Sequence, residues 1–177
     1  MHFANMLTLT LATTALAAPI SQTKRALADY EAVFDNISAQ VAVVSDTVAS
    51  YVSGSTTGDA VQTASNDLVT VINDGATSVA TFDALSSLDA LALVRPIQDL
   101  TADVGDLVDA VIAAEPNFES DGLSADVLAS LQAQKGAAQA LRDAVTPKVP
   151  SALQDIAAEL AEGIVSEIER GIVAYSD

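Results

Sequence analysis

Apolar residues recur at alternating steps of three and four residues along most of the chain. The longest run lies between residues 26 and 53 and consists of Leu27, Tyr30, Phe34, Ile37, Val41, Val44, Val48 and Tyr51. This spacing places the apolar side chains in one stripe along an α-helix, whereas no segment alternates with the period of two that strands require. The repeat therefore predicts an all-α protein in which each helix buries one stripe.

The same repeat continues in further segments that are separated by short polar stretches or prolines. It predicts helices over residues 60–82, 85–94, 93–114, 124–145 and 151–175, with loops at 54–59, 115–122 and 146–151. Pro96 removes a backbone donor, so the third helix is expected to kink or restart near Arg95. Asp59 is the expected N-cap of the second helix, and residues 73–75 (Asn-Asp-Gly) are an expected weak point within it. We therefore expect an up-and-down bundle of about five amphipathic helices, one kinked at Pro96.

The first 25 residues differ from the rest. The apolar run from Leu7 to Leu16 is too short to span a bilayer, which requires about 20 residues. It is followed by the small-x-small pattern Ala15-Leu16-Ala17, so residues 1–17 are interpreted as a secretory signal peptide, cleaved after Ala17 or Ala18. Residues 18–25 are expected to form a short pro-stub that ends at the dibasic site Lys24-Arg25, which leaves one domain at residues 26–177.

The charge balance excludes several classes of partner. The chain has 24 acidic and 7 basic residues, and removal of Lys24 and Arg25 leaves a net charge of 5 − 24 = −19. A surface of this sign does not bind nucleic acid and is poorly suited to an anionic membrane. It favours a soluble monomer, and a hydrophobic content of 50% is not that of a disordered chain.

The chemistry that most enzymes use is missing after residue 25, where the chain has no His, Cys, Trp or Met. This composition excludes Ser-His-Asp and Cys-His sites and ordinary zinc sites, and no glycine-rich phosphate-binding motif occurs. We therefore predict no catalytic residue, no cofactor and no metal. Without disulfides the helices are held by packing alone. Asn36, followed by Ile37 and Ser38, is a candidate N-glycosylation site.

The order of these blocks resembles the fungal hydrophobic surface-binding protein A and cell-wall galactomannoprotein family. The resemblance covers residues 26–177. It depends on the signal peptide, the dibasic stub, the cysteine-free helices, the segment from Pro96 to Phe118 and the helix from Pro150 to Tyr175. It implies a secreted or wall-associated, non-enzymatic protein that adsorbs to hydrophobic surfaces. Some relatives hold a fatty acid between their helices. The C-terminal residues 168–177 lack the features of a GPI signal, so no GPI anchor is expected.

Two hypotheses follow for the mechanism. In the first, the apolar stripes turn outward at a waxy or lipid surface, and the acidic outer faces recruit a cationic partner such as a secreted esterase. In the second, the bundle is a lipid carrier, because seams rich in small residues can leave a lengthwise void. The lipid or surface contacts would be made by Tyr30, Phe34, Ile37, Phe82, Leu100, Leu107 and Ile164. Arg95 would then meet a carboxylate head group, or form an ordinary pair with Asp99. A structural wall protein without a ligand is the third alternative.

Overall fold

The computed structural model describes the backbone of residues 18–176 and the side chains from residue 26 onward, so the predicted signal peptide at residues 1–17 lies outside it. Within the described residues the chain is helical and contains no strand, as predicted. The helices are α1 (Ala18–Val52), α2 (Gly58–Thr81), α3 (Ser87–Ala92), α4 (Val94–Ala113), α5 (Glu115–Ser120), α6 (Ser124–Val145) and α7 (Gln154–Ala174). Two 3-10 turns, η1 (Thr146–Lys148) and η2 (Ser151–Leu153), join α6 to α7.

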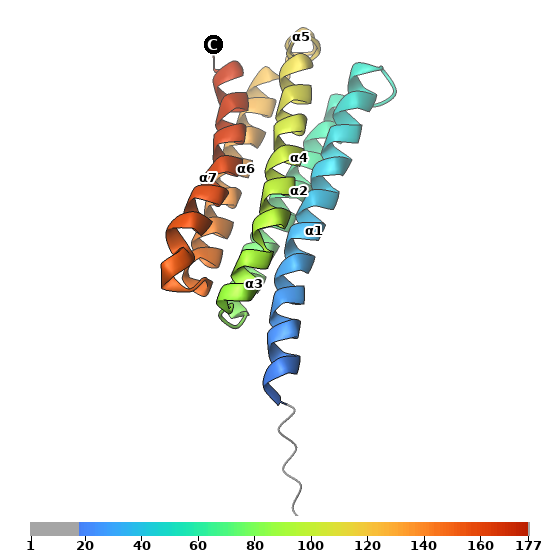
Figure 1. Cartoon of the computed structure of the whole chain (residues 1–177). Coiled ribbons are helices and arrows are strands. Elements are labelled where there is room, and N and C mark those ends of the chain that lie inside the picture. The colour runs from blue at the N-terminus through green and yellow to red at the C-terminus, as the bar shows by residue number, and fades with distance from the viewer. Residues whose placement is uncertain (1–17, 177) are drawn as a thin grey trace, which may run out of the picture.

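The five long helices form a ring. The most extensively packed pairs are α1 with α2, α2 with α6, α6 with α7, α7 with α4, and α4 with α1. The helices run nearly parallel to one common axis (Figure 1). Because each long helix packs mainly on two neighbours, the apolar stripes all face the centre of the ring.

The two short helices lie at opposite ends of this ring. α3 connects α2 to α4 at one end, and α5 connects α4 to α6 at the other (Figure 1). Neither connection joins two helices of a closely packed neighbouring pair, so both cross an end of the bundle. Below, the "α3 end" and the "α5 end" refer to these two ends.

The apolar repeat predicts most of the core correctly. All the seam residues of α1 from Tyr30 to Tyr51 are buried, as are those of α4 together with its two cap residues, Leu93 and Ala114. The break in the third predicted helix falls at Leu93, and Pro96 lies in the first turn of α4. A proline is tolerated there because the backbone N–H of a first-turn residue has no partner within the helix.

Two local predictions are wrong. Residues 115–122 are not a plain loop, because α5 forms there with Pro116 in its first turn and Phe118 buried against the bundle. The N-cap of α2 is Thr57, which makes no side-chain capping bond, while Asp59 lies within the first turn. A carboxylate is favourable there because it faces the positive end of the helix dipole. The backbone of residues 18–25 is helical and continues α1 toward the N-terminus, and the pro-stub at these residues stays a prediction.

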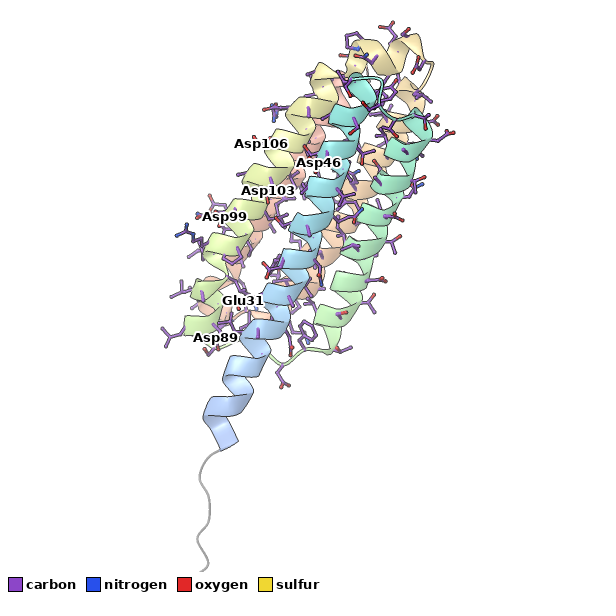
Figure 2. The ribbon with its side chains drawn as sticks, turned by 90° about the vertical axis from the view of Figure 1, so that its right-hand side faces the viewer. Glu31, Asp46, Asp89, Asp99, Asp103 and Asp106 are labelled. Atoms are coloured by element: carbon purple, nitrogen blue, oxygen red, sulfur yellow. The ribbon has the colours of Figure 1, made fainter. Side chains whose placement is uncertain are left out.

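The carboxylates lie on the outside of the bundle. No Asp or Glu side chain between residues 26 and 176 is buried. Figure 2 shows Glu31, Asp46, Asp89, Asp99, Asp103 and Asp106 along the α1–α4 face. The lysines and arginines between residues 26 and 176 bind surface carboxylates or backbone carbonyls, as in the ion pairs Lys135–Glu169 and Arg170–Asp109. The acidic character therefore belongs to the surface, and the interior carries little charge.

Gly75 and Gly136 offer a test of helix packing. Gly75 in α2 is buried, and a Cβ there would lie 2.9 Å from Val33 Cγ1 of α1. Gly136 in α6 is exposed, and a Cβ would meet nothing within 4 Å. Ala is favoured over Gly in a helix by about 0.5–1 kcal/mol. We expect Gly136→Ala to raise the free energy of unfolding by that amount.

Gly75→Ala should lower the free energy of unfolding, because overpacking against a stiff, buried valine costs about 1–3 kcal/mol. Urea denaturation of both variants measures the difference. An equal rise in both would show that α1 and α2 approach less closely than described.

Candidate functional site

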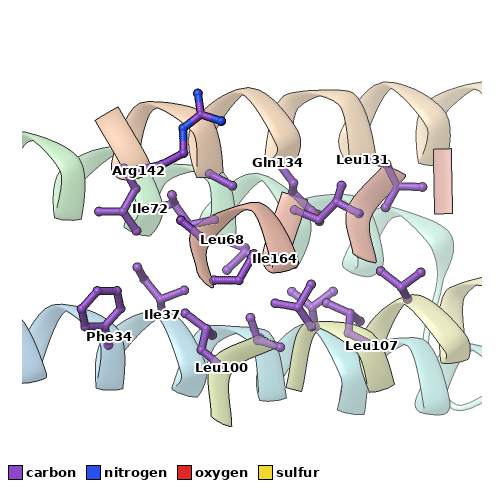
Figure 3. A pocket seen from close by; sticks show the side chains of 18 of the residues that line it. Phe34, Ile37, Leu68, Ile72, Leu100, Leu107, Leu131, Gln134, Arg142 and Ile164 are labelled. Carbon is purple, nitrogen blue, oxygen red and sulfur yellow. The ribbon is translucent and has the colours of Figure 1, made fainter. Parts of the chain in front are cut away.

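The centre of the ring encloses one long apolar cavity of about 150 Å³. All five long helices contribute to its lining (Figure 3). The α1 and α4 walls consist of aliphatic and aromatic side chains, among them Val41, Val44, Val104 and Leu107. A cavity of this size holds a molecule such as benzene. A long acyl chain needs more room, so a helix must move outward to admit one.

The α5 end of the cavity is closed by a cluster of three aromatic rings. Tyr51 stacks on Phe118 with ring centroids 4.6 Å apart, and Phe118 meets the edge of Tyr175 at 6.4 Å. The Tyr51 hydroxyl donates to Asp121 Oδ2 at 2.7 Å, and the Tyr175 hydroxyl donates to the Val111 carbonyl at 2.7 Å. These bonds tie α1, α4, α5 and α7 together around Phe118, which lines the cavity.

The α3 end is held by polar contacts between the α2–α3 connection and its neighbours. Lys148 Nζ donates to the carbonyls of Ala80 and Phe82, and the Leu85 N–H donates to the Lys148 carbonyl. The Tyr30 hydroxyl donates to the Asp83 carbonyl at 2.9 Å, and its ring packs edge-on against Phe82. This end is therefore held by hydrogen bonds to backbone carbonyls and by the fully buried ring of Tyr30.

The first half of α7 is the least packed wall of the cavity. None of the residues from 154 to 164 is buried, although Leu160 and Ile164 line the cavity. Ile156 of α7 is 49% exposed, and Leu91 of α3 is 52% exposed. Both residues also line the cavity. We infer that the cavity opens to solvent between α3 and the start of α7, and this opening explains why Ile156 is exposed although it lines the cavity.

The α2–α6 wall carries the polar side chains of the interior. Ser65, Ser130 and Gln134 are buried and line the cavity, and Gln62 Nε2 donates to Ser130 Oγ at 3.1 Å. Ser65 belongs to the apolar repeat of 60–82, and Gln134 lies midway in the seven-residue step from Leu131 to Ala138. A polar residue at such an inward position is the signal that could have singled out Gln134, which we missed in the sequence.

The structure brings together part of the predicted contact set. Phe34, Ile37, Leu100, Leu107 and Ile164 line the cavity, whereas three other members of the set do not: Tyr30, Phe82 and Arg95. Arg95 points to solvent and pairs with Asp99 at 3.6 Å, which is the ordinary i,i+4 alternative. Asn36 is exposed on α1, so its glycosylation stays a prediction.

All three tyrosines of the chain are buried, so we predict that they ionise at a higher pH than a free tyrosine. Burial, reinforced by Asp83, raises the pKa of Tyr30 from 10.0 to about 12. Burial and the bond to Asp121 do the same for the pKa of Tyr51, and burial also raises the pKa of Tyr175. A raised pKa means that the folded protein holds the proton more tightly than the unfolded chain does.

The contribution of the protonated tyrosines to the free energy of unfolding is fully present below about pH 10 and is lost as the pH rises through about 12. We therefore expect no tyrosinate absorbance near pH 10.5 in the native protein, and cooperative ionisation with unfolding above it. Ionisation of one ring at the ordinary pKa, without unfolding, would contradict the sealed ends.

Two features of a metalloprotein or a membrane protein are missing from residues 18–176. No group of three or more His, Cys, Asp or Glu residues in this part of the chain is arranged to hold a metal ion. No helix there is long and apolar enough to cross a membrane.

Comparison with known proteins decides the family. The model of the family "Hydrophobic surface binding protein A" matches residues 27–147. The chain belongs to the hydrophobic surface-binding protein A family. Cell wall mannoprotein 1 of Aspergillus fumigatus, a relative of this family member, is 40% identical over the whole chain, and that of Aspergillus flavus is 37% identical. The chain spans 61% and 63% of the length of these two relatives.

Solved structures share the fold of this hydrophobic surface-binding protein A family member. Ligand-binding domain 1 of the Penicillium marneffei MP1 protein, complexed with arachidonic acids, has a TM-score of 0.79 at 29% identity and covers 86% of the chain and 100% of that domain. Ligand-binding domain 2 of the same protein, complexed with multiple arachidonic acids, has a TM-score of 0.79 at 31% identity and covers 84% of the chain and 95% of that domain.

Proposed function

We propose that this protein is a non-enzymatic, secreted carrier that holds a fatty acid or a similar lipid in the central cavity. The observation that carries the proposal is the cavity itself, which is enclosed by five helices and lined mainly by aliphatic side chains. The two MP1 domains solved with arachidonic acids support it, since they have the same fold at 29% and 31% identity.

Entry of the lipid takes place at the loosely packed first half of α7. This segment carries half-buried aliphatic residues over the cavity, while its second half is anchored by Val165, Ile168 and Gly171. A Cβ at Gly171 would lie 3.3 Å from both Leu131 Cδ1 and Val108 Cγ1, so this half of α7 lies close against α6 and α4. Outward rotation of residues 154–164 enlarges the cavity and exchanges contacts within the protein for contacts with the lipid. Burial of apolar surface is worth about 25 cal/mol per Å². Because the buried apolar area stays nearly the same, the exchange costs little free energy.

Extraction of the purified protein tests the proposal directly. Organic extracts of protein secreted by a fungal host are analysed by mass spectrometry, and the stripped protein is then titrated with a fluorescent fatty acid. We expect a stoichiometric acyl lipid in the extract and saturable binding after stripping. Clean extracts together with no binding of the fluorescent fatty acid would overturn the proposal.

Adsorption to a hydrophobic surface is the second candidate function. It is favoured by Leu88 and Leu91 of α3 and Ile156 of α7, whose large side chains are exposed by 80%, 52% and 49%. In this proposal these three residues contact the surface first. The acidic outer faces of the helices stay in water and recruit a cationic secreted hydrolase. The protein acts as a monomer, outside the cell or within its wall. Far-UV circular dichroism and amide exchange on polystyrene beads test it. An unchanged spectrum and exchange as slow as in solution would exclude opening of the bundle.

A further inference from the structure

Two neutral polar side chains stand in the middle of the cavity wall. Ser65 of α2 and Gln134 of α6 are each 6% exposed, and both line the cavity. Gln134 projects from α6 toward the space between the helices (Figure 3). It lies ten residues from the start of α6 and eleven from its end, so it is about 15 Å from either end of the helix.

Neither side chain has a hydrogen-bond partner among the residues that the structure describes. No hydrogen bond joins the Ser65 hydroxyl or the Gln134 amide to any described side chain or backbone group, whereas the adjacent Ser130 accepts one from Gln62. No side-chain nitrogen or oxygen in the described part of the chain is both sealed off and unbonded. The free polar atoms of Ser65 and Gln134 therefore open onto the cavity, where buried polar groups require a partner.

Charge is absent from this part of the cavity. Among the described residues that line it, the charged ones are Asp59 of α2 and Asp126 and Arg142 of α6, and α1, α4 and α7 contribute none. Asp126 and Arg142 each lie eight residues from Gln134, about 12 Å along the helix. Arg142 is already bound to Asp143 and Glu162, each at 3.0 Å. Among the described lining residues, no free cation is available to a carboxylate beside Gln134.

We propose that Ser65 and Gln134 bind the polar head group of the lipid in an uncharged form. This inference rests on the proposed carrier function and names the class of ligand: a protonated fatty acid, a fatty alcohol or another lipid with a neutral oxygen-bearing group. The hydroxyl of such a group donates to the Gln134 carbonyl oxygen, and its oxygen accepts from the Ser65 hydroxyl or the Gln134 amide. A carboxylate at the same place would be a buried, unpaired charge, which proteins avoid by taking up a proton.

The pH dependence of binding separates a neutral from a charged head group. Dodecanoic acid and dodecan-1-ol are titrated by displacement of N-phenyl-1-naphthylamine, an uncharged fluorescent probe, at about pH 5.5 and about pH 8.5. A free carboxylic acid ionises like a glutamate, near pH 4.3, so its protonated fraction falls about a thousandfold across this interval. We expect the apparent Kd of the acid to rise steeply with pH, by up to that factor, and the Kd of the alcohol to stay constant.

Substitution of the two side chains tests their role. The double variant Ser65→Ala, Gln134→Leu removes both hydrogen-bonding groups and leaves an apolar wall. We expect it to bind dodecan-1-ol about tenfold more weakly, as expected for the loss of one or two hydrogen bonds, and to bind dodecane as tightly as the parent. Gln132→Leu, at an exposed position on the same helix, is the matched control and should change neither affinity.

The outcomes are distinguishable. Equal affinity for dodecanoic acid at both pH values, or an unchanged alcohol affinity in the double variant, would overturn the neutral head-group site while leaving the carrier function intact. Failure of all three compounds to displace the probe would instead refute the carrier function itself. A double variant that loses dodecane as well would show that Ser65 and Gln134 act only through the fold, which also overturns the inference.

Discussion

Replacing Ala138 by tryptophan is expected to abolish lipid binding while the bundle stays folded. Ala138 is half-buried on α6, one turn beyond Gln134, and lines the cavity. An indole ring at this position enters a space that holds about one benzene-sized molecule. The ring takes the place of the ligand, so we expect the affinity for a fluorescent fatty acid to fall by far more than tenfold, a loss above about 1.4 kcal/mol.

The fold should tolerate this change because the added atoms occupy empty volume. Overpacking of a filled core costs about 1–3 kcal/mol, and a cavity reduces that cost. Ala140→Trp, two residues away on the exposed face of α6, is the matched control and should bind lipid normally. Thermal melting and far-UV circular dichroism establish that both variants are folded. Normal binding by a folded Ala138→Trp variant would mean that the ligand does not occupy the central cavity.

Replacing Phe118 by alanine is expected to give the largest loss of stability of any single truncation proposed for this protein. Phe118 is 1% exposed and lies between Tyr51 and Tyr175 at the α5 end. Truncation of a buried phenylalanine costs about 3–5 kcal/mol, because the transfer energy is lost and a cavity remains. Small domains are stable by only about 5–15 kcal/mol, so a large fraction of the total would disappear.

Phe82→Ala serves as the matched comparison at the opposite end. Phe82 also packs against a tyrosine, Tyr30, at 5.1 Å, but it is only half-buried. Its truncation should therefore cost clearly less than that of Phe118, and lipid binding should survive it. Guanidinium denaturation of the two variants measures both losses. A loss for Phe82→Ala equal to that for Phe118→Ala would show that the α5 end is no better packed than the α3 end.

Much of the candidate site could be read from the sequence, but not its polar part. Phe34, Ile37, Leu100, Leu107 and Ile164 line the cavity because an inward stripe reaches the centre of any bundle. Three other proposed contacts lie elsewhere: Tyr30 and Phe82 at the α3 end, and Arg95 in solvent. Their positions depend on where each helix ends relative to its neighbours, which a periodic pattern does not specify.

The amino-acid order alone determined the helices, the residues that face inward and the acidic exterior, because these follow from the 3.6-residue period of a single helix and from the separation of apolar and charged side chains. Only the tertiary structure decided that α1, α2, α6, α7 and α4 close into a ring, that α3 and α5 cross its ends, and that Ser65 and Gln134 meet an empty space. The physical reason is that hydrophobic burial is non-directional. Several similar stripes can pair in many orders, and short connections, close glycine contacts and side-chain shape select one of them.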